Sequence, residues 1–174
     1  QPDGLNTTAI YGSASIATVS AAHYGIGNGL TRTVLTLTAV PVTITDNGAN
    51  GSGGVKIYDF PECIFVSIAA SANCTVAYGS VTDANVIASL GSVVAAADAT
   101  LTSTEANIIP STSAATTSGA GTFAGDSTAV TVLNGTSTAV DLYLNLATST
   151  DPSTNNSATV SGTITLIWAN GGDN

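Results

Sequence analysis

The chain has 174 residues, enough for one domain, and its composition already excludes several classes of protein. Charged residues make up 7% and apolar residues 44%, so the chain can bury a core but must cover its surface with Thr, Ser, Asn and Gly. The net charge of −9, with Arg32 and Lys56 as the only cations, excludes phosphate-driven binding to nucleic acid and electrostatic docking on an anionic membrane.

The residue types favour strands over helices. The surface of a helix needs straight-chain residues, yet Lys and Arg together number 2 and Met is absent. Thr, Val and Ile are abundant, and their branched side chains suit strands. No stretch approaches the roughly 20 uninterrupted apolar residues of a membrane helix. The composition predicts an all-β protein whose acidity either keeps a Lys-poor surface soluble or suits a basic partner.

Residues 1–30 are rich in Gly, Ser, Ala and Thr, which predicts an extended N-terminal arm ahead of a β-sandwich domain at 31–174. Large apolar side chains of this arm could contact a partner, and the candidates are Ile10, Tyr11, Ile16 and Tyr24. The only histidine, His23, lies in the same segment. We expect it to be a packed or solvated polar residue and not a catalytic base.

The clearest strand pattern covers residues 31–46. Leu35, Leu37 and Ala39 share one face, whereas Val40, Val42 and Ile44 have the opposite parity. This change of parity lies next to Pro41, which cannot donate a ladder hydrogen bond. This combination predicts a bulge or an edge position. The Gly-rich stretch from Asp46 to Gly54 is predicted to be a loop.

A short strand is predicted at 55–60, followed by a buried strand at 63–70 and, after a turn at 71–73, its hairpin partner at 74–78. Asp59 and Glu62 bracket the bend at Pro61, where they could cap backbone amides or meet an arginine of a partner. Cys63 and Cys74 flank the apolar run, so both a local disulfide and buried free thiols are open.

Further along, Thr102 and Glu105 match a capping box, which predicts one short helical turn, and residues 111–122 are predicted to be a surface loop or a cluster of β-turns. Strands are predicted at 130–133, 140–146 and 160–168. In these strands alternation places Leu142, Leu144, Leu146 and Trp168 inward, and Asp141, Tyr143 and Asn145 outward. About eight strands without βαβ alternation predict a β-sandwich or jelly roll.

The sequence offers no clear catalytic machinery. One histidine stands far from any marked nucleophile, the carboxylates are dispersed, and two cysteines with one histidine do not make a zinc site. We therefore expect a non-enzymatic protein without a cofactor or a metal.

Several strings of the sequence are informative together: TRTVLTLTAVPVTITD, VKIYDFPE, LTSTEANIIPST, DLYLNLA and TVSGTITLIWANGGDN. They resemble the head decoration (cement) proteins of tailed bacteriophages, and the resemblance covers most of residues 31–174. It implies a jelly-roll-like sandwich that binds the major capsid protein on the outer surface of the virion as a homotrimer. It also implies assembly in the host cytoplasm, where Cys63 and Cys74 would stay reduced. An extended arm could then add a strand to a neighbouring sheet edge.

A virion fibre, tail or adhesin module that binds a host glycan is the alternative. Such a module usually displays an aromatic platform, and Trp168, the only tryptophan, is predicted to face inward.

Overall fold

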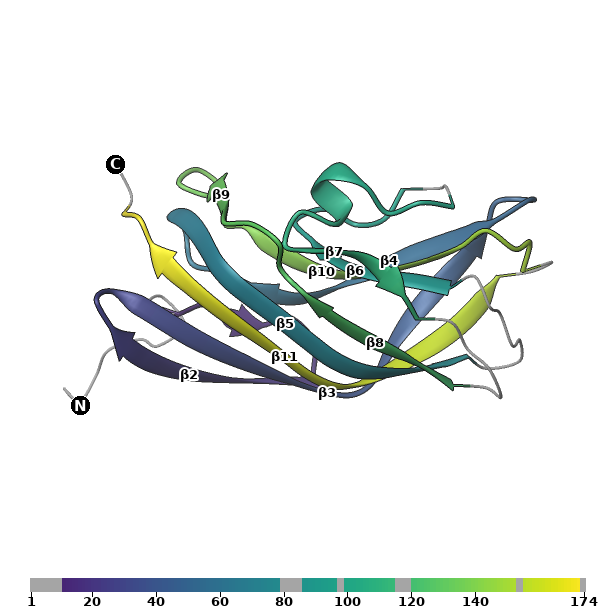
Figure 1. Ribbon diagram of the computed structural model, residues 1–174, viewed down its shortest axis with the longest axis horizontal. Coiled ribbons are helices and arrows are strands. Elements are labelled where there is room, and N and C mark those ends of the chain that lie inside the picture. Colours follow the sequence, from purple (N-terminus) through teal and green to yellow (C-terminus); the bar gives the residue numbers. More distant parts are fainter. Residues whose placement is uncertain (1–10, 79–85, 97–98, 115–119, 153–154, 173–174) are drawn as a thin grey trace.

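The computed structural model describes residues 11–78, 86–96, 99–114, 120–152 and 155–172, and these residues form an almost purely β structure (Figure 1). Its elements, in chain order, are β1 (Ser13–Ala14), β2 (Val19–Gly27), β3 (Leu30–Asp46), β4 (Gly51–Asp59), β5 (Ile64–Tyr78), β6 (Val86–Gly91), the 3-10 turn η1 (Ser103–Glu105), β7 (Ile109–Ser113), β8 (Ala120–Asp126), β9 (Thr131–Asn134), β10 (Asp141–Thr148) and β11 (Asn156–Asn170). The all-β prediction is confirmed.

The strands belong to one sheet that nearly closes on itself like a barrel. Eight of them follow the order β7-β6-β10-β4-β3-β11-β5-β8, while β1, β2 and β9 flank β4, β3 and β5 respectively. The first and last strands of this order, β7 and β8, lie beside each other. In Figure 1, β2, β3, β11, β5 and β8 form one layer, and β4, β10, β6 and β7 lie behind it.

The pairings between strands are nested along the chain. β6 pairs with β7, β5 with β8, β4 with β10, and β3 with β11, all antiparallel. Along the chain, each pair therefore encloses the previous one: β6 with β7 is the innermost pair, and β3 with β11 is the outermost. β3 connects the two layers, because its last two residues pair with the start of β4.

A bulge in β3 turns both of its apolar sets inward. The buried residues are Leu35, Leu37, Val40, Val42 and Ile44. Two residues of β3, Thr38 and Ala39, lie opposite the single residue Ser161 of β11. Ala39 has a φ of 49°, and its N–H donates to Ser161 Oγ at 2.9 Å. The predicted bulge next to Pro41 is confirmed, and the change of parity in the sequence is its signature.

Two predicted boundaries are wrong. Residues 51–54 belong to β4 and not to a loop, because their glycines permit close approach of other atoms: a Cβ at Gly53 would collide with the carbonyl oxygen of Thr43. Residues 71–73 do not turn, because β5 runs unbroken between β11 and β8.

The described part of the expected N-terminal arm is integrated into the sheet. β2 pairs with β3 from Val19 opposite Leu37 to Gly27 opposite Leu30, and the Val19 side chain is buried. β1 pairs with the end of β4. Residues 13–27 therefore do not form a separate arm. The part of the prediction that concerns residues 1–10 lies outside the described ranges.

The remaining elements agree more closely with the sequence. The predicted capping box is confirmed, since Glu105 Oε2 accepts the N–H of Thr102 at 3.2 Å ahead of η1. Trp168 and the three leucines of β10 are buried as expected. The predicted loop at 111–122 is wrong at both ends, because Ser113 ends β7 and Ala120 begins β8, and residues 115–119 lie outside the described ranges.

Gly162 offers a test of the close packing between β11 and β5. Its φ is 144°, and a Cβ there would collide with the carbonyl oxygen of Asn73. We expect Gly162→Ala to lower the free energy of unfolding by about 2–4 kcal/mol, through backbone strain and displacement of β5. Gly25→Ala is the matched control, since a Cβ at Gly25 meets nothing within 4 Å. Urea denaturation of both variants measures the difference, and equal stabilities would contradict this packing.

Candidate binding surface

The structure gathers two of the predicted contact residues, Ile16 and Asp59, around one hollow. This hollow has a volume of about 500 Å³ and lies between the segment Ser13–Ile16 and the outer edge of β4. Its other lining residues on β4 are Val55 and Lys56. It is shallow and open, as a surface for contact with another protein would be.

The other predicted contact residues are spread over different parts of the molecule. Tyr11 lies at the start of the described chain, where its carbonyl oxygen accepts the hydroxyl of Tyr58. Tyr24 is 46% exposed on β2, and Glu62 is exposed in the connection between β4 and β5. Ile10 lies outside the described residues. The six residues therefore do not form a single site.

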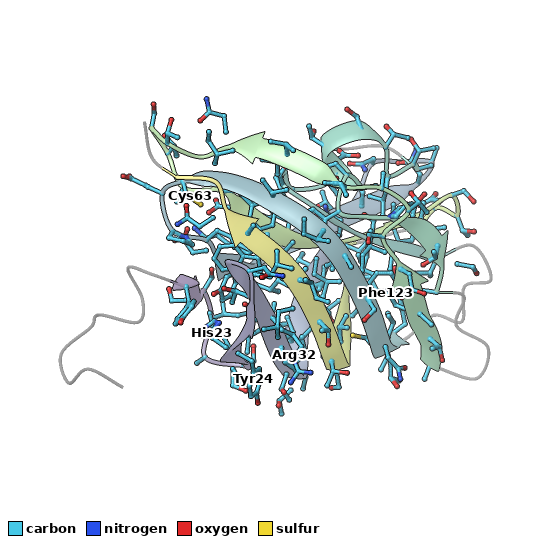
Figure 2. All side chains as sticks on the ribbon, turned by 60° about the vertical axis from the view of Figure 1, so that its left-hand side comes forward. His23, Tyr24, Arg32, Cys63 and Phe123 are labelled. Carbon is cyan, nitrogen blue, oxygen red and sulfur yellow. The ribbon has the colours of Figure 1, made fainter. Side chains whose placement is uncertain are left out.

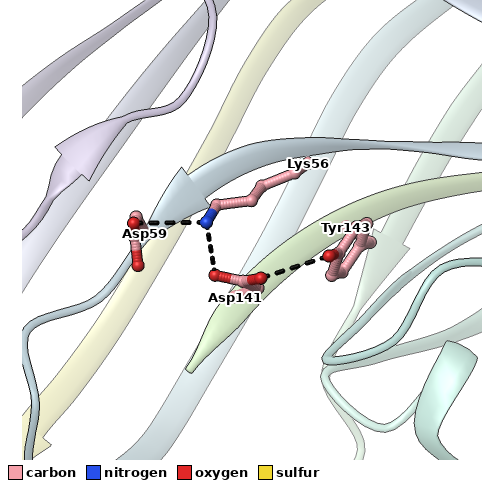
Figure 3. Close-up of polar contacts among 4 residues, drawn as sticks. All are labelled: Lys56, Asp59, Asp141 and Tyr143. Atoms are coloured by element: carbon pink, nitrogen blue, oxygen red, sulfur yellow. Dashed lines mark hydrogen bonds and ion pairs between the residues drawn. The ribbon is translucent and has the colours of Figure 1, made fainter. Parts of the chain in front are cut away.

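A charged cluster borders the hollow (Figure 3). Lys56 Nζ lies 2.6 Å from Asp141 Oδ1 and 3.2 Å from Asp59 Oδ2, and the Tyr143 hydroxyl donates to Asp141 Oδ2 at 3.1 Å. Burial alone would lower the pKa of Lys56, but hydrogen bonds and charge interactions with Asp141 and Asp59 outweigh it and raise the pKa. Lys56 is therefore a fixed ammonium ion between two carboxylates, and the cluster has a net negative charge. It could receive a cation of a partner but is not a nucleophile.

A second hollow, of about 350 Å³, lies on the other side of Asp141. Val93, Val94 and Leu133 line one part of it, while Asp141 and Tyr143 line another. The charged cluster thus contributes to both hollows: Lys56 and Asp59 line the first, and Asp141 and Tyr143 line the second. This arrangement is not predictable from the sequence, because Lys56 and Asp141 are 85 positions apart and meet only through the pairing of β4 with β10.

An aromatic cluster runs from the surface into the core behind this region. Tyr11 stacks on His23 with ring centroids 5.1 Å apart, and His23 lies 6.0 Å from Tyr58. From Tyr58 the contacts continue inward through Phe60, Phe65 and Trp168. The aromatic rings therefore form one continuous set of contacts from Tyr11 to Trp168.

His23 is held in this cluster as a neutral side chain. Trp168 Nε1 donates to Thr33 Oγ1 at 2.9 Å, and the same hydroxyl lies 3.1 Å from His23 Nδ1. Since the indole can only donate, the hydroxyl hydrogen is available to His23. Burial lowers the pKa of His23, which favours the neutral ring that such a bond needs. The indole of Trp168 is buried and cannot serve as an exposed platform for a sugar.

A buried polar network fixes the segment that covers β10. Asn145 was predicted to face solvent, which is wrong: its side chain is fully buried. Its Nδ2 donates to the carbonyl oxygens of Val93 and Glu105, both at 2.9 Å, and its Oδ1 accepts the N–H of Ala95 at 2.9 Å. Glu105 Oε1 in turn accepts the N–H of Ala96. The network satisfies backbone groups of a segment that has no sheet partners of its own.

Both cysteines are buried, and they are not joined in the local disulfide that the sequence left open. Burial raises the pKa of Cys74 to about 11, and its thiol donates weakly to the Thr163 carbonyl oxygen at 3.6 Å. A thiol in this state is inert toward electrophiles.

The described residues contain no group of three or more His, Cys, Asp or Glu side chains placed to hold a metal ion. Nor does this part of the chain have a helix long and apolar enough to cross a membrane. Comparison with protein-family models, with curated proteins and with solved structures gives no match for this chain.

The buried network predicts the effect of removing Asn145. Asn145→Ala would remove the hydrogen bonds to the Val93 carbonyl oxygen and the Ala95 N–H and leave the Glu105 carbonyl oxygen with Ser89 Oγ alone, so we expect the free energy of unfolding to fall by about 2–4 kcal/mol. Asn73→Ala, on the exposed face of β5, should change it by no more than about 0.5 kcal/mol. Denaturant titration of the two variants makes the comparison, and a harmless Asn145→Ala would contradict the role of the network.

The buried and paired groups also predict sensitivity to alkali. In the folded chain the pKa is raised for Cys74, from 9.0 to about 11, for Tyr58 and Tyr143, above 10.0, and for Lys56, above 10.5. A raised pKa contributes stability below its unfolded-state value, and this stability is lost as the pH rises toward the folded-state value. We expect the urea midpoint to be steady between pH 7 and 9 and to fall above pH 9. In Cys74→Ala the fall should begin nearer pH 10, and a midpoint unchanged up to pH 11 would contradict the prediction.

Proposed function

We propose that this chain is a virion structural protein, a decoration protein that binds the outer surface of a bacteriophage head and stabilises its lattice as a trimer. The nested strand order is the observation that carries the proposal. Four nested antiparallel pairs, with β3 passing from one layer to the other, support an eight-stranded jelly roll to which β1, β2 and β9 are additions. The jelly roll is a recurrent architecture of viral capsid proteins and of lectins.

The chemistry of the side chains supports a role in binding and not in catalysis. His23 is half-buried against the rings of Tyr11 and Tyr58, Lys56 is paired with two carboxylates, and Cys74 is a buried thiol with a raised pKa. Each of these groups is occupied in the fold, so what the molecule offers to others is its surface. The absence of a disulfide between Cys63 and Cys74 also suits assembly in a reducing cytoplasm.

The hollow beside β4 is the surface that we propose for the major capsid protein. Tyr11, where the described chain begins, contacts Tyr58 near the end of β4 beside this region, and Asp59 with its neighbours gives the region negative charge. A lattice that offers an arginine or lysine here would gain a charge-assisted contact. Any such contact made only with the assembled lattice stabilises that lattice by linkage.

Binding to particles tests the proposal directly. Antibodies raised against the purified chain should label the outer surface of intact heads from the virus of origin in electron microscopy. Heads that lack the protein should bind it to saturation and then melt at a higher temperature.

Absence of the chain from purified particles would overturn the proposal. Labelling confined to tail fibres, together with binding to host glycans, would favour the fibre or adhesin alternative. A variant without residues 1–10 keeps β1 and β2, so its head occupancy tests the N-terminal segment without removing part of the sheet.

A further inference from the structure

The outer face of the layer that contains β2, β3, β11, β5 and β8 is divided into two chemically different parts. At one end its outward side chains are hydroxyls and amides, such as Thr36, Thr163 and Asn73. At the other end they are apolar, and Ile68 and Val132 are 39% and 62% exposed there. A solvated sheet face should be polar throughout, so the apolar end needs an explanation.

The register shows that the apolar end is continuous across strands. Ala169 of β11 lies between Leu30 of β3 and Val66 of β5, and Val66 lies opposite Val132 of β9. One row further on, Ile167 of β11 lies between Arg32 of β3 and Ala69 of β5. Because directly opposite side chains share a face, these residues form an apolar band about four strands wide. A hollow of about 270 Å³ opens into it between Ile167, Ala69 and Asp126.

Two opposite charges border this band. Arg32 stands at one side, with its guanidinium 4.5 Å from the centre of the exposed Tyr24 ring (Figure 2). Asp126 stands at the other side, exposed on β8 and opposite Ser71 of β5. Neither has an ion pair among the described residues. Since β3, β11, β5 and β8 are consecutive, the two charges lie about 14 Å apart at the usual strand spacing, too far to meet within one chain.

We propose that this band is covered by further copies of the same chain, with Arg32 of one copy paired to Asp126 of the next. The charges of Arg32 and Asp126 favour another copy of the chain as the partner that covers the band. The chain has a net charge of −9, so its acidic surfaces repel one another, whereas this band has one cation and one anion at opposite borders. An Arg-to-Asp contact between different borders is heterologous, and a heterologous contact can close into a ring. In a ring of three the apolar bands gather around the threefold axis.

This inference deepens the proposed function and rests on it for the number of subunits. It assigns the trimer contact to a surface distinct from the hollow beside β4, which stays free for the capsid. Tyr24, one of the contact residues predicted from the sequence, lies in this subunit contact and not in the capsid contact.

Charge reversal tests the pairing, with analytical ultracentrifugation as the measurement. Wild-type protein should have the mass of three chains. Arg32→Asp and Asp126→Arg should each weaken association by about tenfold or more, because each places like charges together. The double reversal should restore most of the loss. The two single variants change the net charge in opposite directions, so if only overall repulsion mattered, Asp126→Arg would associate more tightly than wild type. That result, or no recovery in the double variant, would overturn the pairing.

The apolar band has its own test. Val132→Asp should dissociate the assembly while leaving the circular dichroism spectrum and melting behaviour of the monomer unchanged, since this side chain is largely exposed. Val94→Asp is the matched control, because it introduces the same charge at a 43% exposed valine outside the band. Equal masses for the two variants would overturn the interface. A wild-type monomer that still labels and saturates phage heads would overturn this inference alone, and failure on heads with an intact, charge-dependent trimer would overturn only the proposed function.

Discussion

β3 and β11 pair along almost their entire length, and most of the structure depends on this pair. It is the outermost of the nested pairs, it forms the middle of one layer, and β3 continues from it into the start of the other. Both strands carry large apolar side chains on their inner face, including Leu35 and Trp168, and burying each contributes about 1.5–3 kcal/mol. The bulge at Ala39 lets β3 bury apolar side chains along its whole length. Without it, one half of β3 would point its apolar side chains into solvent.

The sequence predicted those features that follow from alternation and from local hydrogen-bonding chemistry. The strand at 31–46 with its bulge, the inward face of β10 and the capping box at Thr102 and Glu105 were all visible, because each is encoded within a few neighbouring residues. The failures have a common cause. Gly53 and Ser71 are residue types that are common in turns. In the fold, Gly53 allows another chain segment to approach closely, and Ser71 occupies an outward position in a long strand. A single sequence does not tell these uses of small residues from a turn.

The contact surfaces were harder to predict than the fold. Asp59 and Ile16 were singled out and do meet at one hollow, but Lys56 and Asp141 complete that region only through strand pairing. Asn145 was assigned to solvent because its neighbours alternate, and the segment that covers it is recruited from 50 residues away. The apolar band on the outer face was not predicted, since it is assembled from one or two residues of each of several strands. Nothing in any one strand marks it.

The two buried cysteines can report on local opening of the fold. Cys63 lies just before β5 and Cys74 in its middle, so a thiol reagent can reach them only when the strands around β5 separate. Cys63 is held by two backbone hydrogen bonds to Gly135, near the exposed β9, whereas Cys74 lies between β11 and β8. The rates at which the two thiols react therefore measure two different openings of the same strand, one at the margin of the sheet and one through its centre. In the proposed assembly, the ratio of these rates would show which of the two openings is suppressed by contact with neighbouring subunits.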